Sequence, residues 1–412
     1  MRAQSSLPPM RWDDAARQAA MATAACIALS FVVGGVAYAL LGVHESYPGT
    51  HQSGPLGEWF GATAFRWDSE WYLRITDHGY NEIRLAFFPL YPLLASALGA
   101  PIGSPAVAGL LVSVAATFAA LLLLHRLTEL ELGGAAASRA VWIVALFPTG
   151  VFLPAVMTEA LFLALTVGSI YSARLGRWGW AVGLAAAAAL TRNTGVLLIV
   201  PIVLLYLYGP RADRAPVPKQ AGWSPRFPVR RDLVLLAAVP LACAGFLAYG
   251  WASTGDALAS LHAQDEVWDR QVDVPLAATW LAAEDAIEAV GDLATGPGLG
   301  RAVAYGDPTY VSLRALREFA WLVFAAVALV GACRRLPPAY GVYAGLAMLV
   351  PLSAPAPDDP LTSFSRYLLV LFPLHMWLAG WASTRARLAG VLVPSVLLFV
   401  LYAVELANGR WV

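Results

Sequence analysis

The sequence predicts an all-α membrane protein whose chain crosses the bilayer many times. Its mean hydropathy is +0.62 and only 13% of its residues are charged, whereas about 25% is usual in a soluble domain. Several apolar runs are long enough to cross a bilayer as helices. The 15 Trp and 15 Tyr residues fit the aromatic belts that form at membrane surfaces. We therefore expect a single membrane-embedded domain over residues 1–412.

Composition also argues against several functions. A formal net charge of +0 gives no reason to expect a nucleic-acid partner. The three cysteines, Cys26, Cys243 and Cys333, each lie in an apolar run without metal-ligand spacing, so neither a metal nor a cofactor is expected. Glycine-rich phosphate loops and nucleophile elbows are missing from the sequence. Lys219 is the only lysine, a bias that favours a high-GC bacterial source.

The order of apolar runs predicts the topology. The run at residues 19–43 is too long for a signal-peptide core and reads as the first span, with the amino terminus inside. The first span and ten further apolar runs give about eleven spans in all. Those runs lie near residues 105–125, 139–155, 158–173, 178–191, 194–209, 232–252, 317–333, 339–353, 366–382 and 388–406.

The loops between the runs carry an asymmetric charge. Arginines collect in the predicted inside loops, including a linker at 210–231. Most acids fall in the predicted outside loops, above all 44–104 and 253–316. This alternation follows the positive-inside rule. It predicts a multi-pass protein of the plasma membrane with a cytoplasmic amino terminus and an exoplasmic active site.

Residues 65–94 are the part of the chain where charge and aromatic side chains are densest. Asp68, Tyr72 and Thr76 recur at a spacing of four residues, which predicts a short amphipathic helix that Gly79 ends. The apolar stretch that follows is broken by Pro89 and Pro92. An acid at a membrane surface is costly, so we expect this segment to hold the active site.

Asp68 is the candidate catalytic residue. Flanking tryptophans, Trp67 and Trp71, would raise the pKa of its carboxyl group and suit it to act as a general base. The alternative is a solvated acid that pairs with Arg66 or Arg74. Together with Arg84, both arginines are also candidates for binding a phosphate, because a guanidinium group matches phosphate oxygens. Contact with lipid headgroups or simple salt bridging is the alternative.

Other candidates lie further along the chain. Glu159 and Arg192 fall at the outside ends of two predicted spans and would form a pair, either structural or part of the site. Arg366 lies at the outside mouth of a later span. Trp268 would stack on a sugar ring, although ordinary loop polarity explains its surroundings better. His78 is either an acid or a structural histidine.

A family resemblance extends this interpretation. FRWDSEWYLRITDHGY followed by AFFPLYPLL resembles the first exoplasmic loop of the PIG-V mannosyltransferases. Weaker similarity continues in order through ALFPTGVFLPAVMTEALFLALTVGSIYSAR, AAALTRNTGVLL, GDALASLHAQDEVW and SFSRYLLVLFPL. It implies a GT-C glycosyltransferase fold, a polyprenyl-phosphate mannose donor and direct displacement with inversion. No metal requirement follows from it, and the acceptor, whether glycolipid, glycan or protein, is left open.

The resemblance also assigns roles to residues. Asp68 matches the acid of the first loop and would be the general base on the acceptor hydroxyl. The candidates for stabilising the leaving phosphate are Arg66, Arg74, Arg192 and Arg366. Motif positions without an assigned role are His78, Tyr80 and Glu159.

Two competing functions remain open on the sequence alone. A transporter or flippase for a lipid-linked glycan would use similar arginines and aromatics, and so would a non-catalytic subunit of a mannosylation complex. The polar residues fall mostly in outside loops rather than at mid-span, which favours an enzyme that acts at one membrane face. The enzyme hypothesis predicts that Asp68 shares one cavity with Arg192 and Arg366, and that a groove for a prenyl chain opens from it to lipid.

Overall fold

Helices form the framework of the protein in a computed structural model, which describes residues 12–41, 55–217, 224–270, 272–295, 308–357 and 359–410. Within these ranges there is no β-strand, only one isolated bridge between Ala356 and Asp359. The predicted all-α class is therefore confirmed.

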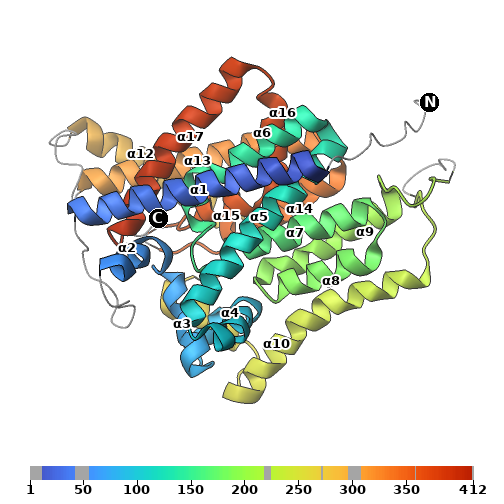
Figure 1. The fold of residues 1–412 in the computed structure, drawn as a ribbon, viewed down its shortest axis with the longest axis horizontal. Helices are drawn as coiled ribbons and strands as arrows, with labels where there is room; N and C mark the ends of the chain where they lie inside the picture. Colours follow the sequence, from blue (N-terminus) through green and yellow to red (C-terminus); the bar gives the residue numbers. More distant parts are fainter. Residues whose placement is uncertain are drawn as a thin grey trace.

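Many of the helices follow one another with short connections, whereas a long one joins Tyr208 to Arg231, as Figure 1 shows. The first half of the chain forms α1 (Trp12–Leu41), α2 (Pro55–Ala64), α3 (Asp68–His78), η1 (Ile83–Ala86), α4 (Leu90–Ile102), α5 (Pro105–Leu132), α6 (Gly134–Ala145), η2 (Pro148–Phe152), α7 (Glu159–Arg174), α8 (Trp178–Ala189), η3 (Asn193–Leu198) and α9 (Ile199–Tyr208). The second half forms η4 (Arg231–Ala237), α10 (Ala238–Thr254), α11 (Ala259–Trp268), α12 (Ala277–Thr295), α13 (Pro308–Arg335), α14 (Pro338–Leu352), α15 (Phe364–Val370), α16 (Phe372–Trp381) and α17 (Arg385–Ala407). Here η denotes a 3-10 helix.

Several of these helices have the length and composition of membrane spans. Among the described residues, five helical segments qualify: α1, α5, α13, α17 and the continuous segment formed by η4 and α10. Five shorter apolar helices accompany them: α4, α6, α8, α14 and the segment formed by η3 and α9. The chain is thus a multi-pass helical membrane protein, whereas the total of about eleven spans stays a prediction.

Two predicted spans differ from the structure. The run at 366–382 is divided at Leu371, between α15 and α16. The run at 139–155 is only partly helical, because α6 ends at Ala145 and Pro148 begins the short η2 helix. The residues from Phe147 to Thr158 nevertheless lie buried in the protein. Non-helical backbone at this depth is tolerated when protein surrounds it. Hydropathy alone could not separate this buried connection from a span.

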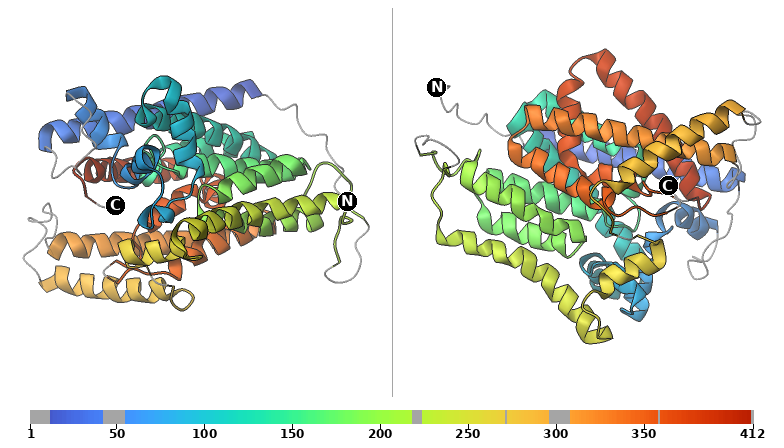
Figure 2. Two further views of the ribbon diagram at one scale, coloured as in Figure 1. Left: turned by 90° about the horizontal axis from the view of Figure 1, so that it is seen from below. Right: turned by 180° about the vertical axis from the view of Figure 1, so that it is seen from behind.

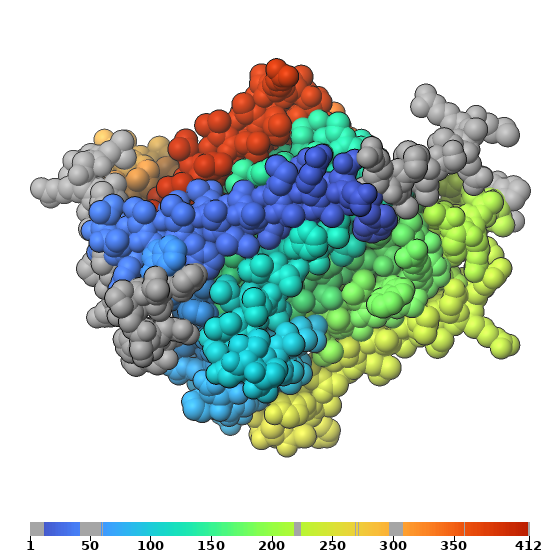
Figure 3. All heavy atoms as spheres, viewed as in Figure 1, coloured from blue at the N-terminus to red at the C-terminus, as the bar shows by residue number. Residues whose placement is uncertain are grey.

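The helix α5 lies at the centre and packs against α1, α4, α6 and α7. In the space-filling view, α1 crosses one face of the molecule, with α17 on one side and α5 on the other (Figure 3). Large apolar side chains such as Val36, Leu40, Val393 and Leu397 are exposed on these helices. An apolar outer surface of this kind suits contact with lipid.

Small side chains bring neighbouring helices together. The buried residues of α12 are Ala278, Ala282, Ala286 and Ala289, which recur on one side of the helix. This side packs against α13, and the two helices lie side by side in both views of Figure 2. Close approach through alanine is a common way to pack helices in membrane proteins, where the hydrophobic effect adds little.

The predicted short helix is confirmed as α3. It ends at Gly79, whose φ of 69° favours glycine. Of the two prolines expected to break the apolar stretch, Pro89 lies at the break between η1 and α4, whereas Pro92 does not interrupt α4. Pro89 precedes α4 and Pro92 lies in its first turn, where the missing N–H has no partner within the helix to lose.

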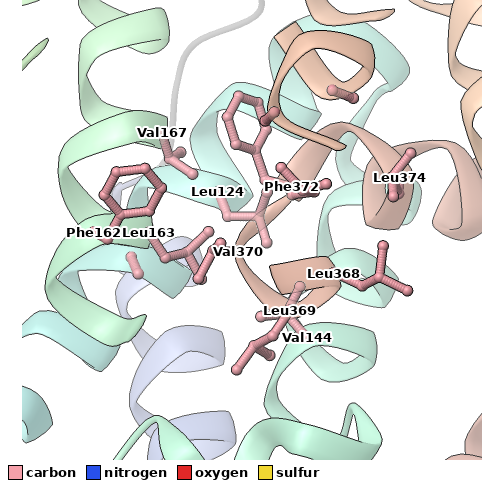
Figure 4. Close-up of a cluster of buried hydrophobic side chains, with 14 of the residues drawn as sticks. Leu124, Val144, Phe162, Leu163, Val167, Leu368, Leu369, Val370, Phe372 and Leu374 are labelled. Atoms are coloured by element: carbon pink, nitrogen blue, oxygen red, sulfur yellow. The ribbon is translucent and has the colours of Figure 1, made fainter. Parts of the chain in front are cut away.

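A large apolar core lies behind the segment that carries Arg366. Figure 4 shows Leu368, Leu369 and Val370 of α15 gathered with Phe162 and Leu163 of α7. All five side chains are at most 3% exposed. Burial on this scale stabilises the short α15 helix, which is too short to be stable alone.

The backbone of Gly195 in η3 lies very close to the backbone of Ala188 in α8, next to the non-helical connection between the two helices. A Cβ at Gly195 would lie 2.3 Å from the carbonyl carbon of Ala188, whereas a Cβ at Gly183 meets nothing within 4 Å. We expect Gly195→Ala to lower the free energy of unfolding by about 1–3 kcal/mol. Gly183→Ala is the control and should leave it nearly unchanged. Thermal unfolding of the two purified variants in detergent measures this, and equal melting temperatures would contradict the prediction.

Candidate active site

A polar cavity of about 120 Å³ lies where segments distant in the sequence meet. Its wall includes residues from α3, from the end of η1 and the residues after it, from the α8–η3 connection, from α11 and the residues after it, and from α15 and the loop before it. These residues are Asp68, Tyr72, Ala86, Phe87, Phe88, Thr191, Arg192, Asn193, Gln264, Arg270, Thr362, Ser363, Arg366 and Tyr367. Asp68, Arg192 and Arg366 thus share one cavity, which confirms the predicted proximity; their roles stay predictions.

Asp68 is the first residue of α3. The residue before it, Trp67, has a φ of 57°, a left-handed conformation that is uncommon for a bulky side chain. This sharp entry turns the helix start toward the cavity, and the Asp68 side chain is only 18% exposed. Its Oδ2 accepts a hydrogen bond of 2.7 Å from Arg366 Nη2. Its Oδ1 accepts none from the described residues, so one oxygen is available to a ligand.

Arg366 is the central cation of the site. Ser363, which precedes α15, has a φ of 60°, and its carbonyl accepts the backbone N–H of Arg366 at 3.0 Å. The guanidinium donates from Nη2 to Asp68, and from Nη2 and Nε to Glu159 Oε1 at 2.6 and 3.2 Å. It also lies 4.6 Å from the centre of the Phe152 ring. Arg366 therefore fixes the position of the Asp68 carboxylate.

Glu159 is fully buried at the start of α7. The buried segment that follows η2 delivers it there, and a helix N-terminus favours a negative charge. Its Oε1 also lies 3.5 Å from Arg192 Nη1, while Oε2 accepts no hydrogen bond from the described residues. The predicted pairing of Glu159 with Arg192 is present, and the short contact with Arg366 adds to it.

Two further arginines flank the ring of Tyr367. The Arg192 guanidinium lies 5.4 Å from the ring centre and the Arg270 guanidinium 5.7 Å. Arg270 also donates to the Tyr367 hydroxyl at 3.3 Å and to the Thr362 carbonyl at 2.6 Å. These contacts hold both cations at the cavity wall without adding negative charge, because a ring and a carbonyl carry no net charge. Among the described residues, Arg192 is offset only by its 3.5 Å contact with Glu159.

The charge balance of the cavity favours an anionic ligand. Its wall carries the three guanidinium groups of Arg192, Arg270 and Arg366 and the single carboxylate of Asp68. Adding buried Glu159 behind the wall still leaves one more positive than negative charge. Arginine binds phosphate oxygens through several hydrogen bonds at once. The arrangement can thus bind a phosphate beside a carboxylate.

Four residues predicted to bind substrate lie away from this cavity. Arg74 is half exposed and pairs with Glu70 one turn earlier on α3. Arg66 donates to the Ala407 carbonyl at 3.4 Å. His78 is exposed at the end of α3, and Tyr80 donates to the Phe87 carbonyl at 3.1 Å. None of these four side chains lines the cavity. For Arg74 and His78, which lie on α3, helix periodicity turns the side chain away from Asp68.

Two tryptophans, Trp67 and Trp268, are also predicted to contact the substrate, and of these two the structure describes the side chain of Trp67 alone. Trp67 is half-buried and packs against the core rather than lining the cavity. Trp268 ends α11, but its side chain lies outside the described part of the structure, so its predicted stacking stays a prediction.

Sequence reasoning did not select several cavity residues. The most consequential is Arg270, which lies in a loop of mixed polarity two residues after Trp268. No periodicity or motif marks it, and only the packing of α11 against η1 brings this loop to the site. Gln264 of α11 donates to the Ala86 carbonyl at 3.3 Å and joins the same two segments.

Comparison with known proteins adds to this geometry. Residues 56–206 match the family model described as Mannosyltransferase (PIG-V). We call this matched stretch the PIG-V segment. This PIG-V segment contains Asp68, Glu159 and Arg192, whereas Arg270 and Arg366 lie beyond it.

Curated relatives agree with the PIG-V segment. The chain is 38% identical over 149 residues to GPI alpha-1,6-mannosyltransferase 2 of Mus musculus, which covers 32% of this chain and 29% of the mouse protein. It is 36% identical over 149 residues to the protein of the same name from Rattus norvegicus. That match covers 32% of this chain and 30% of the rat protein. The match thus spans less than a third of these relatives.

Solved structures with a similar course of the chain include the Archaeoglobus fulgidus oligosaccharyltransferase. Its apo form has a TM-score of 0.44 at 12% identity, covering 93% of this chain and 56% of the other. A form with a tethered acceptor peptide has a TM-score of 0.42 at 12% identity, covering 94% and 56%.

Proposed function

We propose that this protein is an inverting membrane glycosyltransferase of the GT-C type, which moves a mannosyl residue from a polyprenyl phosphate to an acceptor hydroxyl. One observation carries the proposal: the carboxylate of Asp68, inside the PIG-V segment, shares a cavity with three arginines. The reaction needs one base and a site for an anionic leaving group. The cavity offers both in adjacent positions.

The chemistry follows from the contacts. Asp68 Oδ1 accepts the proton of the acceptor hydroxyl while the acceptor oxygen attacks the anomeric carbon. The bond between that carbon and the phosphate oxygen breaks, and the phosphate leaves with the electron pair. Arg192 and Arg270 stabilise the growing negative charge on the phosphate. Arg366 is a positioning residue, since Asp68 and Glu159 already occupy its Nη2 and Nε donors.

The membrane character of the chain supports a lipid donor. Its long apolar helices suit a bilayer, which favours a donor on a prenyl chain that reaches the arginines from within the membrane. We place the site at the exoplasmic face of the plasma membrane, because the acid-rich loops hold most of its wall. A glycolipid, glycan or protein on that face serves as the acceptor.

A donor comparison tests this proposal. Membranes that contain the expressed chain receive radiolabelled mannose either as polyprenyl-phosphate mannose or as GDP-mannose, together with a lipid extract from the source cells. Transfer from the lipid donor alone, absent from membranes without the chain, is the expected result. Transfer from GDP-mannose alone would contradict the proposed donor. Passage of the lipid-linked sugar across the bilayer without transfer would favour a flippase.

The arginines allow a prediction about donor affinity. Arg192→Gln should raise the KM for polyprenyl-phosphate mannose about 10- to 100-fold, the effect of losing a charge-assisted hydrogen bond. Arg74→Gln is the matched control, because Arg74 pairs with Glu70 away from the cavity, and its KM should stay within about twofold of the wild type. Steady-state kinetics with varied donor measures both. Equal KM values in the two variants would remove Arg192 from the phosphate site.

A further inference from the structure

A second and larger cavity, of about 360 Å³, lies between α12, α13 and the loop at residues 359–361. Figure 2 shows the two helices that form most of its wall. The wall carries five carboxylates and a single guanidinium. These groups belong to Asp285, Glu288, Asp292, Glu318 and Asp359, and to Arg314.

Glu318 has no hydrogen-bond donor in the described part of the chain. Its side chain is 5% exposed, and both Oε1 and Oε2 lack a hydrogen-bond partner there. Arg317 Nε lies 3.6 Å from Oε1, too far for a hydrogen bond. Arg317 instead uses Nη1 to contact both oxygens of Glu405 at 2.9 and 3.0 Å. A buried carboxylate without a donor is costly, and on a candidate membrane span it points to function.

The other acids of this cavity add to the negative charge. Arg314, the single guanidinium of the wall, forms an ion pair with Asp359 and therefore does not compensate the other four carboxylates. Asp285 and Glu288 have no basic partner among the described residues. Burial raises the pKa of the Asp285 carboxyl group, and the nearby charges of Glu288 and Asp359 raise it further. Carboxylates gathered in this way repel one another until a cation lies between them.

We propose that this cavity binds an organic cation of the ammonium class, with Glu318 as its innermost partner. A metal ion fits less well, because no three His, Cys, Asp or Glu side chains in the described ranges are arranged to hold one. The acids are instead spread around a space that holds several non-hydrogen atoms. An ammonium group donates up to three hydrogen bonds, and both oxygens of Glu318 accept none from the described residues.

The loop at residues 359–363 contributes to the walls of both cavities. Asp359 accepts a hydrogen bond from Thr362, whose carbonyl accepts one from Arg270 of the candidate active site. A cation in the second cavity therefore contacts the segment that holds Arg270. The proposal nevertheless stands apart from the transferase function, because binding is measured without any sugar donor.

Thermal unfolding with matched ligands tests the site. The purified full chain in maltoside micelles is heated with ethanolamine or with neutral ethylene glycol. A second arm uses nanodiscs of phosphatidylglycerol with or without phosphatidylethanolamine, so that a soluble amine and a lipid headgroup are distinguished. We expect the melting temperature to rise with an ammonium source in at least one arm and not with ethylene glycol.

Variants then locate the effect. Glu318→Gln and, on the cavity wall, Asp285→Asn should each raise the half-effective ammonium concentration at least about tenfold. Glu284→Gln is the control, since Glu284 is exposed on the same helix and lies outside the cavity. No rise with any ammonium source would overturn the proposal. An equal rise with ethylene glycol, or an unchanged response in both cavity variants, would overturn it as well.

Discussion

Asp68→Asn is expected to lower the rate of mannosyl transfer about 10²- to 10⁴-fold, the usual contribution of a general base. Asparagine keeps the size of the side chain and an oxygen that accepts the hydrogen bond from Arg366 Nη2. The cavity should therefore keep its shape while it loses the group that takes the proton. Initial rates at saturating donor and acceptor, with the variant at the same protein concentration as the wild type, measure the effect.

Asp77→Asn is the matched control for this experiment. Asp77 lies on the same helix α3, is exposed to solvent and does not line the cavity. Its replacement changes the net charge by the same amount and should leave the rate within about twofold. A rate for Asp68→Asn as high as that of the control would remove Asp68 from the mechanism.

Arg366→Met is expected to cost about 3–5 kcal/mol of stability and to abolish transfer. The guanidinium is 4% exposed and binds Asp68 and Glu159 together. Methionine fills a similar volume but leaves the fully buried Glu159 carboxylate with only the longer contact to Arg192. Removing one member of a buried ion pair costs this much, because the other charge stays buried without compensation.

A double variant separates the two causes of that loss. Combining Glu159→Gln with Arg366→Met removes the buried negative charge of Glu159 that Arg366→Met leaves without its partner. The double variant should recover about half or more of the stability lost in Arg366→Met. Transfer should stay absent, because nothing then positions Asp68. Thermal unfolding in detergent and the transfer assay together give the answer. Full recovery of transfer in the double variant would show that Arg366 has no role in positioning Asp68.

The sequence predicts the helical framework well because hydropathy reports directly on burial in lipid. The α3 helix and its end at Gly79 follow from spacing and from the conformational freedom of glycine. The break near Arg192 is also visible, since three polar residues interrupt an apolar run. The buried connection between α6 and α7 is not, because its apolar composition equals that of a span.

The site itself is only partly accessible to sequence reasoning. The acids and arginines in or beside apolar runs, Asp68, Glu159, Arg192 and Arg366, stand out because charge is costly there. Arg74 and His78 share a segment with Asp68 but not its side of the helix, and only the structure separates them. Arg270 comes from a loop without a pattern, and its role depends on long-range packing.

The most direct test of the account is transfer in a single turnover by protein that already holds its donor. Purified wild type and Asp68→Asn are first loaded with labelled polyprenyl-phosphate mannose, and the bound label is measured before acceptor is added. We predict equal loading, because the arginines bind the phosphate, and release of the label to the acceptor by the wild type alone. Release at the wild-type rate from loaded Asp68→Asn would contradict the assignment of this cavity as an active site with Asp68 as its base.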